Sequence, residues 1–239
     1  MDQGNQGMRR DHRQARVVGN AVAAVLAAIV VLSAPLPATA ETGVARTPTD
    51  LLRCVQARYG SLRDLSAAFA QESRVASLGR NRSRSGRLFF QAPGRMRWEY
   101  DAPEPQLIVA DGKQFWFYRP ERKQVVVQAI DAAFTRQTPL LFLVGRGDFA
   151  AEFTWDERAP EPGPGESVSI VLRPRVEAPD LSRLVLEIAG GECRLAGTIV
   201  EDAFGNSTHL VFSGERANTG LDTGLFHFAP PKGAEVVRP

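Results

Sequence analysis

The sequence predicts a mainly β protein, an open (incomplete) antiparallel β-barrel of about ten strands with short helices on its concave side. Two observations lead to this fold class. About ten short segments alternate apolar and polar side chains and are separated by turn residues, whereas only two or three short segments have a helical pattern. The 199 residues that remain after the first 40 of the 239 suit one all-β domain better than two smaller domains.

The first forty residues are predicted to be a cleaved secretory signal peptide. Four arginines precede an almost wholly apolar stretch over residues 17–32, and Ala38-Thr39-Ala40 fits a small-x-small cleavage site. The alternative is an uncleaved anchor, but the apolar stretch is shorter than the roughly 20 residues of a membrane span. Cleavage after Ala40 leaves one domain, residues 41–239. Removing four arginines and two aspartates from the 29 basic and 27 acidic side chains leaves 25 of each.

The domain is expected to begin with an amphipathic helix followed by a strand. Thr49 or Asp50 can cap a helix that ends at Gly60 and carries Leu51, Val55 and Tyr59 on one stripe. From Leu65 the apolar period changes to two, which predicts the first strand. The polar and basic residues 77–85 are expected to form a loop or a ragged strand end.

Residues 86–128 predict a meander of four short strands with hairpin turns at Ala92-Pro93-Gly94 and Asp111-Gly112. Large side chains alternate with charged ones, so one face carries rings that either fill a core or line an apolar cavity. We expect an inner, cavity-lining surface of Leu88, Phe90, Met96, Trp98, Tyr100, Trp116 and Tyr118, covered by a helix that carries Leu140, Phe142 and Leu143. The strands before and after the first turn share this face only if that turn has an odd length or contains a bulge.

A second helix and more strands are expected after the meander. Thr138-Pro139 is typical of a cap and first helical position, followed by the apolar residues 140–144. Further strands are predicted over residues 151–155, 167–173, 183–188, 193–201 and 208–213, with a short one near Phe226 and Phe228.

The residues suggest neither an enzyme nor a metal or cofactor site. His209 and His227 are the only histidines after residue 40, and CxxC, HExxH, GxSxG, GxGxxG and P-loop motifs are all absent. Cys54 and Cys193 are the only cysteines. They either form a disulfide in an oxidising compartment or stay two buried thiols.

Positive charge is concentrated in the first half of the domain. Residues 41–146 contain 17 Lys/Arg and 10 Asp/Glu, whereas residues 147–239 contain 8 and 15. Seven arginines fall between Arg74 and Arg97. This surface either contacts an acidic protein or anionic lipid head groups or is a solvated sheet face, and export argues against a nucleic acid partner.

An ordered series of motifs resembles the LolA family, the periplasmic carriers of outer-membrane lipoproteins. The motifs are Leu65 to Gln71 with Phe69; Gly86-x-Leu88; Pro93-Gly94-x-x-Arg97-Trp98; Pro103; Asp111-Gly112 to Trp116-x-Tyr118; Gln124-Val125; Pro139 to Val144; Asp202 with Gly205-Asn206; and Phe226-x-Phe228-x-Pro230-Pro231-x-Gly233. The resemblance implies a non-catalytic, monomeric periplasmic carrier whose concave apolar surface shelters acyl chains. Its partners would be acylated lipoproteins, an inner-membrane ATP-driven lipoprotein-releasing transporter and an outer-membrane acceptor.

One position departs from the family. Similar proteins place an arginine directly before the proline of the first hairpin, where it holds the lid shut, but Ala92 stands there in this sequence. We therefore expect a polar clasp from Arg95 or Arg97, or a lid held by apolar contacts alone. Two alternatives stay open: a LolA-like lipid-binding or envelope-stress sensor domain, and a carrier of a free glycolipid or another envelope lipid.

Overall fold

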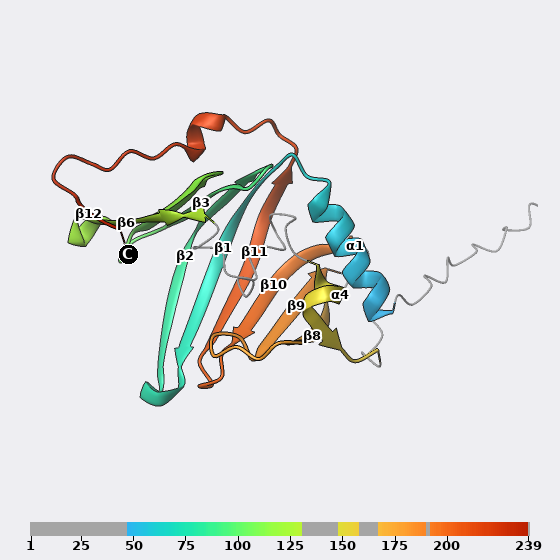
Figure 1. Cartoon of the computed structure of the whole chain (residues 1–239). Coiled ribbons are helices and arrows are strands. Elements are labelled where there is room, and N and C mark those ends of the chain that lie inside the picture. The colour runs from blue at the N-terminus through green and yellow to red at the C-terminus, as the bar shows by residue number, and fades with distance from the viewer. Residues whose placement is uncertain (1–46, 131–147, 158–166, 190–191, 239) are drawn as a thin grey trace, which may run out of the picture. The chain divides into compact units, whose positions relative to one another are not determined.

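A computed structural model describes residues 47–130, 148–157, 167–189 and 192–238. All of them lie in one compact unit, Gly43–Pro239. They form a single twelve-stranded sheet, and its two edge strands, β12 and β7, do not pair with each other (Figure 1). The predicted class, an open antiparallel barrel with few helices, is therefore confirmed. No helix of these residues is long and apolar enough to cross a bilayer.

The strands follow the order β12-β6-β5-β4-β3-β2-β1-β11-β10-β9-β8-β7 across the sheet. Their bounds are β1 Asp64–Val75, β2 Arg80–Gln91, β3 Arg95–Tyr100, β4 Gln106–Asp111, β5 Gln114–Arg119, β6 Gln124–Ala129, β7 Phe153–Trp155, β8 Val168–Pro174, β9 Arg183–Ala189, β10 Arg194–Glu201, β11 Ser207–Ala217 and β12 Glu235–Val237. The helices are α1 Pro48–Gly60 and α4 Phe149–Glu152, with 3₁₀ turns η1 Ala76–Leu78, η2 Pro120–Arg122 and η3 Thr223–Phe226. Among the strand pairs of the described residues, β12–β6 alone is parallel.

Helix α1 starts earlier than its sequence pattern suggested. Thr47, not Thr49 or Asp50, is the N-cap, and its Oγ1 accepts a hydrogen bond from the Asp50 backbone N–H at 3.1 Å. Pro48 occupies the first helical position, where a missing N–H costs nothing because that group would be unpaired anyway. The expected stripe is buried and also includes Leu52.

The β1–β2 hairpin is longer than predicted. Residues 80–85, expected to be a loop or a ragged end, belong to β2 and pair with β1 from Val75↔Arg80 onwards. Only η1 and Gly79, at φ 56°, form the turn. The segment is polar because most of its side chains are exposed on both faces, so alternation gave no strand signal there. The region predicted as four strands contains the end of β2 and four further strands, β3 to β6.

Two of the later predicted strands differ from the structure, and one strand was missed. Of the strand predicted over residues 151–155, only 153–155 form β7, because the Asp148 side chain accepts hydrogen bonds from the N–H groups of Ala150 and Ala151 and caps the short helix α4. The segment near Phe226 is η3, which is capped in the same way by Asp222. Strand β12 was not predicted, since three residues are too few to show a period.

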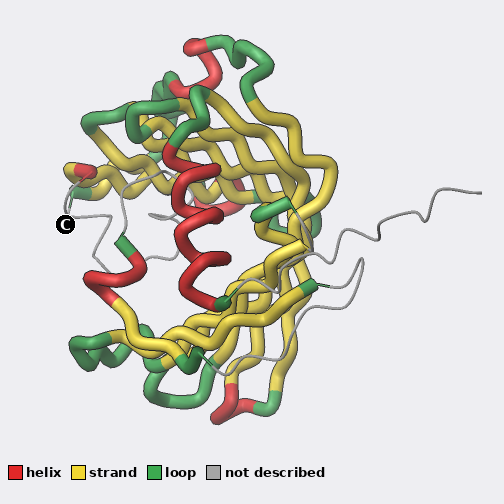
Figure 2. Tube along the Cα trace, turned by 90° about the vertical axis from the view of Figure 1, so that its right-hand side faces the viewer, coloured by secondary structure: helices red, strands yellow, loops and turns green. Residues whose placement is uncertain are grey.

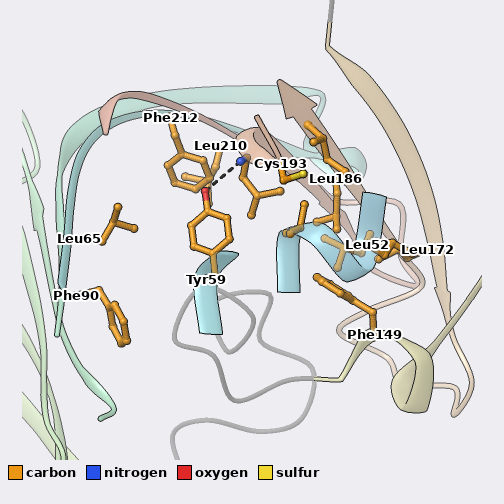
Figure 3. Close-up of a cluster of buried hydrophobic side chains, with 14 of the residues drawn as sticks. Leu52, Tyr59, Leu65, Phe90, Phe149, Leu172, Leu186, Cys193, Leu210 and Phe212 are labelled. Carbon is orange, nitrogen blue, oxygen red and sulfur yellow. Dashed lines mark hydrogen bonds between the residues drawn. The ribbon is translucent and has the colours of Figure 1, made fainter. Parts of the chain in front are cut away.

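Helix α1 lies on the concave side of the sheet, which curls around it (Figures 1 and 2). Its buried face packs against α4 and the inner side chains of β8 to β11, as Figure 3 shows for Leu52, Phe149, Leu172 and Leu186. The side chains of Leu172, Leu184 and Ile188 are 0% exposed. This half of the concave face is therefore filled by the protein itself.

Three connections fix α1 to the sheet. Cys54 and Cys193 form a disulfide with a Cα–Cα distance of 5.6 Å. The Tyr59 hydroxyl accepts from the backbone N–H of Leu195 at 3.0 Å (Figure 3). It donates to Glu215 at 3.0 Å. Arg58 pairs with the same carboxylate at 2.6 Å. Because a disulfide and hydrogen bonds both hold α1, the helix is a fixed part of the concave face.

Candidate functional site

The first hairpin of the meander sets the inner face. Its loop, Ala92–Gly94, has three residues between the ends of β2 and β3, so Leu88 lies opposite Trp98 and Phe90 opposite Met96. The expectation of an odd-length loop is confirmed. Residues directly opposite in an antiparallel pair point to the same face, and the four side chains are all at most 3% exposed.

An aromatic cluster occupies the middle of this face. The ring centroid of Phe69 lies 4.7 Å from that of Trp98 and 5.0 Å from that of Tyr100. Gly86 makes the cluster possible, because a Cβ atom there would lie 2.8 Å from Cζ of Phe69. Burial raises the pKa of the Tyr100 phenol, which donates a hydrogen bond to Gln71 at 2.9 Å. Besides this hydroxyl, the polar group of the cluster is the indole N–H of Trp98, which is buried and has no hydrogen-bond partner within the described residues.

The expected placement of Trp116 and Tyr118 on the inner face is wrong. Trp98 pairs with Ile108, and Ile108 pairs with Phe117. Phe117 is thus the inner residue of β5, and its neighbours Trp116 and Tyr118 point to the opposite face. Both rings lie 5.7 Å from the ring of Phe228, in the segment after η3.

The register instead adds inner residues that the sequence did not single out. One row runs directly across five strands, Leu88–Trp98–Ile108–Phe117–Val126. We call these residues the inner row. Ile108, Phe117 and Val126 are half-buried, in contrast to the fully buried leucines under α1. The β4–β6 half of the concave face therefore keeps partly accessible apolar side chains. The predicted covering residues Leu140, Phe142 and Leu143 lie outside the described residues.

The opposite face of this half is closed by the C-terminal segment. Val109 and Val125 are 0% exposed, and η3 lies against β3 and β4. Arg97 donates to the carbonyl oxygen of Leu225 at 3.1 Å, and Gln91 to that of Leu221 at 2.9 Å. In Figure 1 this segment crosses from the end of β11 to β12. Trp116, Tyr118 and Phe228 thus form part of a second, smaller apolar layer.

Arg95 and Arg97 alternate with Met96 and Trp98 and so lie on the outer face, where Arg95 donates to Gln91 and Arg97 to Glu99. The two expectations for the lid, a polar clasp from one of these arginines or apolar contacts alone, both concern residues outside the described part of the chain.

The two described histidines lie away from the concave face. His209 lies 3.0 Å from Glu187 on the outer face, and His227 is exposed. Among the described ranges, no group of three or more His, Cys, Asp or Glu side chains could hold a metal ion. The concave face offers apolar surface for binding rather than a nucleophile beside a base.

Comparisons with known proteins agree with this geometry. The family model described as outer membrane lipoprotein carrier protein LolA matches residues 60–229. The outer-membrane lipoprotein carrier protein of Chromobacterium violaceum is 35% identical over 173 residues, 72% of this chain and 80% of that protein. The protein of the same name from Chromohalobacter salexigens is 32% identical over 208 residues, 87% and 92% of the two chains.

A solved structure shares the fold. The uncharacterized conserved protein from Thermus thermophilus aligns with a TM-score of 0.51 at 17% identity and covers 80% of this chain and 98% of its own. The likeness in sequence extends over most of the chain, and the open sheet is the one that the family resemblance implied. This chain belongs to the LolA family of outer-membrane lipoprotein carrier proteins.

Proposed function

We propose that this protein is a periplasmic carrier that shelters the acyl chains of lipoproteins on their way from the inner to the outer membrane. The observation that supports it best is the inner row, where Ile108, Phe117 and Val126 stay half-buried in an otherwise closed core. Family membership supplies the cargo class, since the relatives are named as carriers of outer-membrane lipoproteins. Residues 1–40 would direct export and be removed.

Physical constraints argue for weak binding. Burying acyl chains gains about 0.8 kcal/mol per methylene, or roughly 12 kcal/mol for one sixteen-carbon chain. Two or three such chains in a rigid slot would exceed the roughly 18 to 21 kcal/mol at which non-covalent affinity saturates. A carrier must release its cargo, so a face already part-filled by Trp98, Tyr100 and Phe69 is better suited than an empty slot.

Loading needs an energised donor. Acyl chains leaving a bilayer gain no hydrophobic free energy, because they were already in hydrocarbon. We infer that an inner-membrane ATP-driven transporter releases the lipoprotein to this carrier and that an outer-membrane acceptor receives it. The carrier itself acts as a monomer and performs no chemical step.

The cargo can be identified by mass spectrometry of molecules that co-purify with the protein from the periplasm. Acylated peptides are the expected result. Free lipid alone would overturn the lipoprotein assignment and favour the envelope-lipid alternative. Recovery of neither, together with binding of another envelope protein's periplasmic segment, would favour a sensor domain.

The binding face is tested by Ile108→Glu with Val211→Glu as its control. Both residues are β-branched and strand-borne, but Ile108 lies in the inner row whereas Val211 is 43% exposed on the outer face. A charge in the inner row costs several kcal/mol unless it reaches water. We expect Ile108→Glu to lose affinity for an uncharged apolar dye while Val211→Glu keeps it. Equal dye binding by both folded variants would refute the assignment.

A further inference from the structure

A basic pocket lies at one end of the β4–β6 half of the concave face. Its volume is about 350 Å³, and its lining includes Phe117 of the inner row. The charged residues that line it are four arginines and two glutamates: Arg82, Arg84, Arg119, Arg122, Glu104 and Glu121. The formal charge of this lining is therefore +2, directly beside the partly accessible apolar side chains.

Two of the arginines are held in place by rings of the concave face. Arg84 continues the inner face of β2 beyond Gly86, and its guanidinium carbon lies 5.6 Å from the ring centroid of Tyr100. Arg119 lies two residues after Phe117, and its guanidinium carbon is 5.3 Å from that ring. Cation–π contacts of this kind orient a guanidinium without neutralising it.

These guanidinium groups keep unused donors. The Nε atoms of Arg84 and Arg119 are both buried and have no hydrogen-bond partner within the described residues. Arg84 donates its other nitrogens to Glu104 at 2.9 Å and Gln106 at 3.3 Å, and Arg119 donates to Gln124. A buried donor without a partner is costly, so both sites would gain from an acceptor supplied by a ligand.

The carboxylates do not balance the arginines. Glu104 is shared by Arg82 at 3.1 Å and Arg84 at 2.9 Å. Neither Arg119 nor Arg122 forms an ion pair with an acidic side chain in the part of the chain that the structure describes. Planar guanidinium groups match the oxygens of phosphates and carboxylates, often with two parallel hydrogen bonds.

We propose that this pocket binds the anionic group, a phosphate or a carboxylate, of an amphiphile whose acyl chain crosses the inner row in the direction of the strands. The inference rests on the proposed function, because it adds a polar site to the same cargo. Strands rise about 3.4 Å per residue. Measured along the strands, Trp98 and Phe117 of the inner row therefore lie about 7 Å from Tyr100 and Arg119 at the pocket, and Met96 lies about 7 Å beyond Trp98. The anionic group would sit at the rim while the chain runs inward.

The test measures displacement of an uncharged apolar dye by dodecyl phosphate, by dodecyl phosphocholine and by inorganic phosphate alone. The parent protein should bind dodecyl phosphate at least several-fold more tightly than dodecyl phosphocholine, and this preference should shrink as salt is added. Inorganic phosphate should displace no dye. Arg119→Gln should weaken dodecyl phosphate binding by about tenfold or more, since hydrogen bonds to charged groups contribute about 1.5–3 kcal/mol, and should reduce the preference for dodecyl phosphate over dodecyl phosphocholine.

Two further variants keep the test decisive. Arg87→Gln is the control, because Arg87 is a strand arginine like Arg119 but lies on β2, points to the outer face, is 67% exposed and pairs with Glu99. It should change neither affinity. Glu121→Gln raises the charge of the lining and should strengthen dodecyl phosphate binding. The proposal is refuted if the parent does not discriminate between the two amphiphiles, or if Arg119→Gln and Arg87→Gln behave alike.

The source of the anion is distinguished with palmitoylated Cys-Asp and Cys-Asn peptides. A preference for the aspartate peptide assigns the pocket to a cargo polypeptide, and a preference confined to dodecyl phosphate assigns it to a lipid head group. Dye binding without any anion preference would refute this inference and leave the carrier function standing. Absence of dye binding would refute the carrier function itself.

Discussion

Tyr59→Phe is expected to destabilise the protein by about 2–5 kcal/mol. The Tyr59 side chain is 2% exposed, and its hydroxyl accepts from the N–H of Leu195 and donates to Glu215. The β9–β10 register is irregular at Leu195. The backbone N–H of Leu195 therefore bonds to a helix side chain, the Tyr59 hydroxyl, rather than to a strand. Leaving a buried N–H unpaired costs about 1–3 kcal/mol, and the lost bond to a carboxylate adds about 1–2 kcal/mol, since Arg58 still pairs with Glu215.

The assay is urea unfolding followed by far-UV circular dichroism. Tyr118→Phe is the control, because no hydrogen bond of its hydroxyl is found in the described structure and its stability should stay within about 0.5 kcal/mol of the parent.

Burial raises the pKa of Tyr59, and Glu215 raises it further. The neutral phenol is thus favoured by folding, and the parent loses stability above the unfolded pKa of about 10. The difference between parent and Tyr59→Phe should shrink there. Equal unfolding of parent and variant at neutral pH would refute the reasoning.

Three further predictions concern stability. Gly86→Ala should destabilise by about 1–3 kcal/mol, because its Cβ would overlap an aromatic ring and the β3 backbone, whereas Gly60→Ala, with no atom within 4 Å of the new Cβ, should be nearly neutral by the same unfolding assay. The unfolded, non-reduced protein should show no reactive thiol at Cys54 or Cys193, and removing this cross-link over a separation of 139 residues should cost up to about 5 kcal/mol. Burial alone would raise the pKa of Asp64, but backbone N–H bonds hold it below its ordinary value, so stability is present above the unfolded pKa of about 3.9 and is lost as pH falls towards the folded pKa. Asp64→Asn should weaken this acid dependence of unfolding, and an unchanged profile would contradict it.

Most of the sheet could be predicted because turn residues separate its strands. The three-residue turn before Arg95 has the odd length that places Leu88 and Trp98 on one face. The apolar alternation within β2 and β3 therefore predicted this shared face correctly. The polar end of β2 was missed, since a strand solvated on both faces has no apolar period. The N-cap was misplaced by two or three residues because Thr47, Thr49 and Asp50 are all capping residues, and only the position of Pro48 decides between them.

The faces of β5 could not be predicted from residue type. Phe115, Trp116, Phe117 and Tyr118 are all aromatic, so both faces of the strand look equally apolar. The face of each β5 residue follows only from the strand pairing, which depends on the lengths of the turns on either side of β4. The two-residue connection between β4 and β5 places Ala110 opposite Phe115. The ring of Phe228 then covers the face that carries Trp116, which explains why the C-terminal motif contains aromatic residues.

The two halves of the concave face differ in what cargo would have to displace. Entry beneath α1 would require breaking the bonds of Tyr59 and uncovering leucines that are 0% exposed, and the Cys54–Cys193 disulfide limits how far the helix can move. Entry over Ile108, Phe117 and Val126 of the inner row meets half-buried side chains instead. We therefore expect a folded Cys54→Ser/Cys193→Ser variant to bind the apolar dye with an affinity no more than a few-fold from that of the parent. A large gain in affinity without the disulfide would instead show that α1 must swing away to admit cargo.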